Sequence, residues 1–233
     1  MSVAPLILFS GMGADERLLA PQRDAFPRLI VPVWVPPEHH ETLAHYATRM
    51  AERVDPHEPC FVGGASFGGF VAIEAARHLQ ARACFLIGSA RCCEELPLQI
   101  RAMRKLKHML PAIPFEWAPS AAHMSLGTAG NWMRPCARSI YKQLGDAKGS
   151  FLRWACYAVL SWDPPELPLP FPVYHIHGGM DRVLPAKNTH PDEIVPRAGH
   201  LLTLTHPEKV NHFLEEKMMA VEHTEAPAYA LHA

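Results

Sequence analysis

The sequence predicts an α/β fold: a three-layer sandwich in which a mostly parallel sheet of about six strands lies between helices. Two observations lead to this prediction. Short apolar runs alternate with helix-length segments along most of the chain, which is typical of parallel strands joined by crossover helices. The length of 233 residues suits one α/β domain with a full core, so we interpret residues 1–233 as a single domain.

Each predicted strand is a short apolar run. The strands are expected near residues 5–10, 29–35, 59–65, 83–89, 172–177 and 192–196. Residues 41–54 and 207–221 repeat apolar side chains every three or four positions, which predicts helices packed on a sheet. The segment after residue 66 is apolar round most of its circumference, so we expect its helix to be buried.

The stretch from residue 91 to residue 170 breaks this alternation and is too long for a plain loop. We expect helices near 96–110 and 150–161, with an irregular, proline-containing part between them. The whole stretch is interpreted as a cap-like insertion that folds over the carboxyl edge of the sheet. Residues 222–233 lack periodicity and are expected to fray.

Composition and charge argue against several classes of partner. The net charge is −1 and the 22 lysines and arginines are mostly scattered, so we expect no nucleic-acid-binding surface. No apolar run reaches the roughly 18 residues that a membrane-spanning helix needs. Six cysteines fall at no zinc-binding spacing, and the adjacent Cys92 and Cys93 are interpreted as structural, which favours a reducing, cytoplasmic location.

The third predicted strand ends in the motif Gly64-x-Ser66-x-Gly68, and a helical pattern follows directly. This arrangement is typical of a nucleophile elbow, a tight strand-to-helix turn that presents a serine hydroxyl. Glycine two residues to either side leaves room for the turn. Ser66 is therefore the candidate nucleophile.

A serine hydroxyl needs a neutral imidazole to take its proton, and the imidazole needs a carboxylate to fix its tautomer. Asp181 follows the run 172–177, and His200 follows the last predicted strand. Because ligands bind beyond the carboxyl ends of parallel strands, both side chains are expected on the same rim as Ser66. Asp163 is a rival for the acid, but it precedes a strand and is interpreted as a cap or turn residue.

Two glycines frame Met12 directly after the first predicted strand. We expect the backbone N–H groups of Met12 and Phe67 to form an oxyanion hole, a pair of fixed donors for the charge that develops on a substrate carbonyl oxygen.

Taken in order, four segments resemble the α/β-hydrolase fold superfamily, in particular its small esterase-like branch. The segments are residues 10–13, 64–69, 177–181 with Pro185, and 199–200. The resemblance implies that Ser66 is the nucleophile, Asp181 the acid and His200 the base. The chain departs from the family where Ser10 stands in place of a frequent histidine, and it lacks the usual opening pair of antiparallel strands.

These residues predict a serine hydrolase that cleaves a small-molecule ester or thioester, with a small to medium acyl group, through an acyl-enzyme and without a metal or cofactor. Trp117, Met124 and Trp132 are candidates for lining an apolar acyl pocket. A basic stripe on the predicted helix 96–110 could attract an acidic carrier protein, although a solvated face is the favoured interpretation. Its members are Arg101, Arg104, Lys105 and His108.

Other reactions use the same triad, and the sequence leaves them open: acyl transfer, hydrolysis of carrier-protein esters, perhydrolysis and C–C bond hydrolysis. A ligand-binding protein without catalytic activity is an alternative of another class. His175 and His177 alternate on a predicted buried strand, where metal binding would need further ligands at matching spacing. We expect these two rings to make hydrogen bonds within the core instead.

Overall fold

The computed structural model describes residues 4–105, 107, 114–166 and 168–229. Within them, six strands form one sheet in the order β2-β1-β3-β4-β5-β6, and every neighbouring pair is parallel. The predicted α/β fold with a mostly parallel sheet of about six strands is confirmed. The strands are β1 (Leu6–Phe9), β2 (Leu29–Ile30), β3 (Cys60–Ala65), β4 (Ala81–Ile87), β5 (Val173–Gly178) and β6 (Glu193–Val195).

Only β2 is much shorter than its apolar run. The run 29–35 predicts seven residues, but pairing with β1 ends at Ile30. The run contains Pro32 and is followed by Pro36 and Pro37, and proline has no N–H to donate to a neighbouring strand. The edge of the sheet therefore gives way to a loop at this point.

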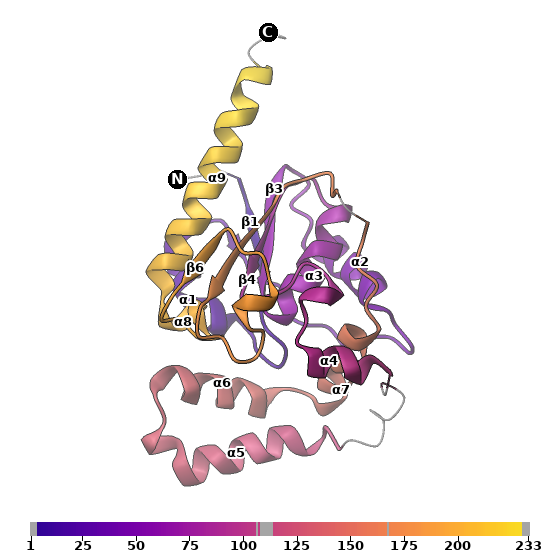
Figure 1. Ribbon diagram of the computed structural model, residues 1–233, viewed down its shortest axis with the longest axis vertical. Helices are drawn as coiled ribbons and strands as arrows, with labels where there is room; N and C mark the ends of the chain where they lie inside the picture. The colour runs from indigo at the N-terminus through magenta and orange to yellow at the C-terminus, as the bar shows by residue number, and fades with distance from the viewer. Residues whose placement is uncertain (1–3, 106, 108–113, 167, 230–233) are drawn as a thin grey trace.

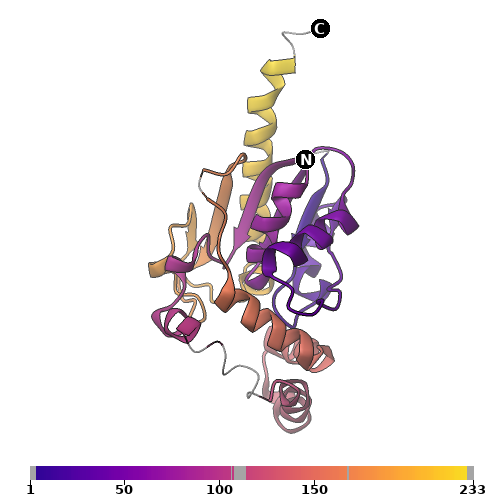
Figure 2. The same ribbon diagram turned by 90° about the vertical axis from the view of Figure 1, so that its right-hand side faces the viewer.

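Helices cover both faces of the sheet (Figure 1, Figure 2). One apolar cluster packs α2 (Leu43–Val54), α3 (Phe67–Ala75) and α7 (Gly149–Ser161) on one face. A second cluster packs residues of α8 (Leu202–Thr205) and α9 (Pro207–Tyr229) on the other, where the short α1 (Ala20–Ala25) also contacts both helices. All nine residues of α3 are buried, which confirms the prediction of a central helix after residue 66.

The last helix extends further than the apolar pattern predicts. Among the side chains that the structure describes, Met218 and Val221 are the last apolar ones of α9 that pack on the sheet, yet the helix continues to Tyr229 and projects beyond the sheet (Figure 1). The described part of residues 222–233 is helical as far as Tyr229, and residues 230–233 lie outside it, so fraying of this end stays a prediction. Apolar periodicity reports where a helix is buried, whereas helix propagation requires only backbone hydrogen bonds. None of the helices in the described ranges is long and apolar enough to cross a membrane.

The insertion between β4 and β5, residues 91–170, is called the cap here. It contains α4 (Leu98–Met103), α5 (Trp117–Ala129) and α6 (Pro135–Asp146), followed by α7. Figure 1 shows the α5–α6 hairpin beyond the carboxyl ends of the strands.

Of the predicted cap helices, 150–161 is confirmed by α7, and 96–110 is represented by the shorter α4, with part of the range outside the described residues. The prediction of an irregular part between them is wrong, because α5 and α6 occupy it. Pro119 lies in the first turn of α5 and Pro135 is the first residue of α6. Proline is tolerated there because the first N–H groups of a helix have no partner within it, so these prolines mark helix starts.

Substitution of Gly64 by alanine is expected to destabilise the protein. A Cβ atom at Gly64 would lie 2.1 Å from the carbonyl oxygen of Gly68, which is backbone and cannot rotate away. We expect a loss of about 3 kcal/mol in the free energy of unfolding, measured by urea denaturation. Gly127→Ala, in α5, is the matched control, because its Cβ meets nothing within 4 Å. The control should gain up to about 1 kcal/mol, and equal stability of the two variants would contradict the prediction.

Candidate active site

Ser66 occupies the turn between β3 and α3 with a φ of 53°, in the left-handed region that non-glycine residues rarely adopt. Hydrogen bonds hold this backbone conformation. The Ser66 N–H donates to the carbonyl oxygen of Ile87 at 3.0 Å, and the Ser66 carbonyl accepts from the Ser89 hydroxyl at 2.8 Å. A strained residue that its surroundings hold in place is the geometry of a nucleophile elbow.

The structure brings the three predicted side chains into one hydrogen-bonded chain. His200 Nε2 lies 2.9 Å from Ser66 Oγ, and His200 Nδ1 lies 2.7 Å from Asp181 Oδ2. The three residues follow β3, β5 and β6, so the shared rim of the parallel sheet brings them together. Asp181, and not its rival Asp163, is the carboxylate in contact with His200.

The Asp181 carboxylate is buried and surrounded by donors. Its Oδ1 accepts the backbone N–H groups of Val183 at 2.8 Å and Leu184 at 2.9 Å, and its Oδ2 faces His200. Burial acts to raise the pKa of Asp181, but hydrogen bonds from His177 and His200 outweigh it and hold the pKa well below its ordinary value of 3.8. An ionised Asp181 keeps the proton of His200 on Nδ1, which leaves Nε2 free to accept the proton of Ser66.

The two predicted oxyanion donors are unpaired in this structure. No acceptor among the described residues takes the backbone N–H of Met12 or of Phe67. Phe67 is the first residue of α3, where N–H groups point out of the helix, and Met12 lies in the turn after β1. Both groups are therefore available to bind an anionic oxygen.

Hydrogen bonds within residues 10–15 hold the loop that carries Met12. The Ser10 hydroxyl donates to the carbonyl of Ala14 at 3.0 Å, and the Ala14 N–H donates back to Gly11 at 3.1 Å. The indole N–H of Trp34 donates to the same Gly11 carbonyl at 3.3 Å. Ser10 thus closes the loop on itself.

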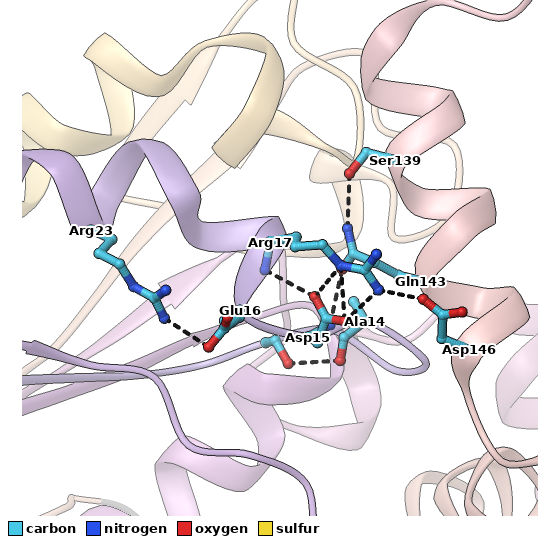
Figure 3. A network of polar contacts seen from close by, with 9 residues as sticks. Ala14, Asp15, Glu16, Arg17, Arg23, Ser139, Gln143 and Asp146 are labelled. Atoms are coloured by element: carbon cyan, nitrogen blue, oxygen red, sulfur yellow. Dashed lines mark hydrogen bonds and ion pairs between the residues drawn. The ribbon is translucent and has the colours of Figure 1, made fainter.

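The cap also holds this loop, through a polar network shown in Figure 3. The backbone N–H of Asp15 donates to Gln143 Oε1 of α6 at 2.9 Å, and Gln143 is itself buried and donates to Ser139. Arg17 also connects the loop with the cap, because its Nη2 lies 2.6 Å from Asp15 Oδ2 and 2.7 Å from Asp146 Oδ2 of α6. No local sequence pattern marks Gln143, because its partner lies 128 residues away.

Gln143→Leu is expected to lower kcat about 10-fold with little change in KM. The substitution leaves the partly buried N–H of Asp15 without its side-chain acceptor, which costs up to about 1–3 kcal/mol and releases the loop that carries Met12. Steady-state kinetics on an ester substrate measures the effect. Lys142→Ala, at the neighbouring exposed position, should leave kcat unchanged. A normal kcat in Gln143→Leu would show that the loop keeps its shape without the cap.

A cavity of about 380 Å³ opens between this loop and the cap, with walls that include Trp34, Pro36 and Phe151. None of the three predicted pocket residues lines it. Trp117, Met124 and Trp132 are 72%, 67% and 90% exposed and do not line this cavity, so their role in an acyl pocket stays a prediction. The physical reason for this exposure is that α5 is the outer helix of the hairpin and buries only Ala122.

The predicted basic stripe is described only in part. Arg101 and Lys105 are exposed, Arg104 donates to the Cys93 sulfur, and His108 lies outside the described residues. Binding of an acidic carrier protein therefore stays a prediction. Burial raises the pKa of both Cys92 and Cys93, which agrees with a structural role for the pair.

One group of possible metal ligands exists among the described residues: Glu38, Glu41 and His45, at the start of α2. Arg49 already pairs with both carboxylates, because its Nε lies 3.5 Å from Glu38 Oε1 and 2.7 Å from Glu41 Oε1. His175 and His177 bond to each other within the core, as expected from their alternation on β5.

The fold and the hydrogen-bonded chain together define a class: α/β enzymes in which an elbow serine is paired with histidine and aspartate. A comparison with protein families agrees. The chain belongs to the alpha/beta hydrolase family, whose model matches residues 6–213, and we therefore describe the protein as a hydrolase.

Solved structures with similar folds include several enzymes of low sequence identity. A thermophilic esterase from Thermogutta terrifontis is 18% identical, with a TM-score of 0.69 over 94% of this chain and 91% of its own. The N-acyl homoserine lactonase AidH is 15% identical, with a TM-score of 0.67 over 94% and 90%. BpoC of Mycobacterium tuberculosis H37Rv, a non-heme bromoperoxidase by its assigned name, is 19% identical, with a TM-score of 0.63 over 94% and 93%. At this identity the likeness establishes the fold alone, and none of the curated proteins compared with the sequence matches it.

Proposed function

We propose that the protein is a serine hydrolase that cleaves the carboxylic ester or thioester of a small to medium acyl group. One observation carries this proposal: the continuous hydrogen bonding from Ser66 Oγ through His200 to the ionised Asp181. The similarity in fold to an esterase and to a lactonase, an enzyme that by its name opens a cyclic ester, supports the same class of bond.

In the proposed mechanism His200 Nε2 takes the hydroxyl proton as Ser66 Oγ attacks the carbonyl carbon of the substrate. The N–H groups of Met12 and Phe67 stabilise the negative oxygen of the tetrahedral intermediate. When the intermediate collapses, His200 gives its proton to the departing alcohol or thiol, which leaves an acyl group on Ser66. A water molecule then repeats the sequence: it loses a proton to His200, attacks the acyl carbon and releases the acid.

We further propose that residues 1–233 act as one domain and that the cap, residues 91–170, selects a small-molecule substrate. The hydrogen bond from the loop that carries Met12 to α6 supports this role.

A panel of esters and thioesters of graded acyl length, assayed beside an organophosphonate probe, tests the proposal. We expect hydrolysis of at least one ester or thioester and labelling of one serine, identified as Ser66 by peptide mass. A folded wild-type protein that neither hydrolyses the panel nor takes the label would overturn the proposal.

In an assay from about pH 8 to about pH 5, hydrolysis is expected to fall toward the acid end, because the mechanism needs a neutral imidazole at His200 to accept the Ser66 proton. The pKa of Asp181 lies below 3.8, so this carboxylate stays ionised and its contribution to stability is retained over the whole range. The acid loss should therefore be reversible and occur in folded protein, as measured by kcat/KM and circular dichroism at each pH. A flat profile would contradict the assignment of His200 as base.

A further inference from the structure

Two histidines that the proposed mechanism does not use lie behind Asp181, both fully buried on β5. His177 Nε2 is 2.6 Å from the carbonyl oxygen of Leu184 and 3.4 Å from Asp181 Oδ2. On the other side of the ring, His177 Nδ1 is 2.9 Å from His175 Nε2. The hydrogen-bonded chain of the active site thus continues inward through two more rings.

The contacts assign the protons of both rings. A carbonyl oxygen only accepts, so His177 Nε2 must carry a hydrogen that points at Leu184 and Asp181. In a neutral His177 the Nδ1 is then an acceptor, and His175 Nε2 must donate to it. This leaves His175 Nδ1 without a hydrogen, which agrees with its lack of a partner among the described residues.

The surroundings keep His175 uncharged. Burial lowers the pKa of His175 to about 3, and the neighbouring His177 ring and the positive charge of Arg91 act in the same direction. The positive charge of Arg91 is paired with the carboxylate of Asp192 at 3.1 Å. Asp192 Oδ2 also accepts the backbone N–H of His175 at 2.7 Å. His175 is thus a fixed donor that holds its neighbour in one tautomer.

We propose that His177 is a positioning residue for the acid of the active site, with its tautomer set by His175. Its Nε2–H reaches both ends of the turn 181–184: the carboxylate of Asp181 and the carbonyl of Leu184. The same turn supplies the backbone N–H groups of Val183 and Leu184 that bind Asp181 Oδ1. His177 therefore fixes both oxygens of the carboxylate, one directly and one through the turn, in the position that His200 requires. This inference rests on the proposed function and deepens it.

The test compares His177→Leu with His177→Gln. Leucine removes the donor, and we expect kcat to fall about 10- to 100-fold, with KM within about twofold, because a small displacement of a catalytic group has effects of this size. The glutamine amide carries an N–H at about the same distance from the backbone as Nε2, so it should restore kcat to within about fivefold of wild type. Equal losses in both variants would mean that the ring is needed only for packing.

Tyr46→Phe is the matched control for the loss of a buried hydrogen bond. It removes the bond from the Tyr46 hydroxyl to the carbonyl of Val35 and leaves Asp181 untouched. It should keep the wild-type kcat even where its stability falls.

The rate of Ser66 labelling by an organophosphonate separates this inference from the proposed function. A wild-type protein that is not labelled overturns the proposed function. Equal labelling rates for the wild type and for His177→Leu would overturn only the positioning role. If His177→Leu does not fold, ¹⁵N spectra of the wild-type imidazoles decide, because the inference requires a hydrogen on Nε2 of both rings near neutral pH, and a hydrogen on Nδ1 alone of His177 would overturn it.

Discussion

Ser66→Ala is expected to lower kcat for ester hydrolysis at least about 10⁴-fold, because it removes the atom that attacks the carbonyl carbon. The fold should survive. Ser66 holds its turn through backbone groups, bonded to Ile87 and to the Ser89 hydroxyl, and these contacts do not involve its Oγ. The variant should therefore melt close to wild type while it loses both hydrolysis and labelling by an organophosphonate.

Steady-state kinetics, intact-protein mass after labelling and thermal unfolding together measure this prediction. Ser120→Ala, an exposed serine on α5, is the control and should keep full activity and full labelling. Substantial hydrolysis by Ser66→Ala would show that another group is the nucleophile. If the wild type shows no hydrolytic activity and Ser66→Ala binds the ligand as tightly as the wild type does, the ligand-binding alternative is favoured.

Asp181→Asn is expected to lower kcat about 10³- to 10⁴-fold without a change in shape. The asparagine carbonyl can still accept the N–H groups of Val183 and Leu184, so its amide nitrogen faces His200 Nδ1. An amide N–H₂ only donates, which forces the imidazole to carry its hydrogen on Nε2 instead. A ring in this tautomer cannot accept the proton of Ser66.

The matched variant is Asp163→Asn, which changes the rival carboxylate in the same way. It should stay within about twofold of wild-type kcat, because Asp181 is the carboxylate that contacts His200. A larger loss for Asp163→Asn than for Asp181→Asn would reverse the assignment of the acid.

The sheet could be predicted because its strands are buried on both faces and so appear as continuous apolar runs, as in Phe61 and Val62 of β3. The contacts of His200 with Ser66 and with Asp181 follow from the same pattern. Once the carboxyl ends of the strands are known, the rim of a parallel sheet places the residues that follow them side by side. The catalytic roles of these residues stay predictions.

The cap could not be predicted in the same way, because the apolar residues of an outer helix do not indicate burial. Trp117 and Met124 face outward from α5, whereas the pattern rule assumes that large apolar side chains face a core. The contacts of Gln143 with Asp15, and of Arg17 with Asp146, join positions more than a hundred residues apart. No local periodicity encodes such pairs, so only the folded arrangement reveals them.

The bond between Gln143 and the backbone of Asp15 limits how this hydrolase can be re-engineered. A chimera that replaces residues 91–170 with the cap of a relative would change the cap side of the cavity, at Gln143, Asp146 and Phe151, but it would leave the Asp15 N–H without its acceptor. A successful graft must therefore bring a buried side-chain oxygen to this point on its second hairpin helix. Exchange of the cap in this chain therefore changes two things at once: the cap side of the cavity and the support of the loop that carries Met12.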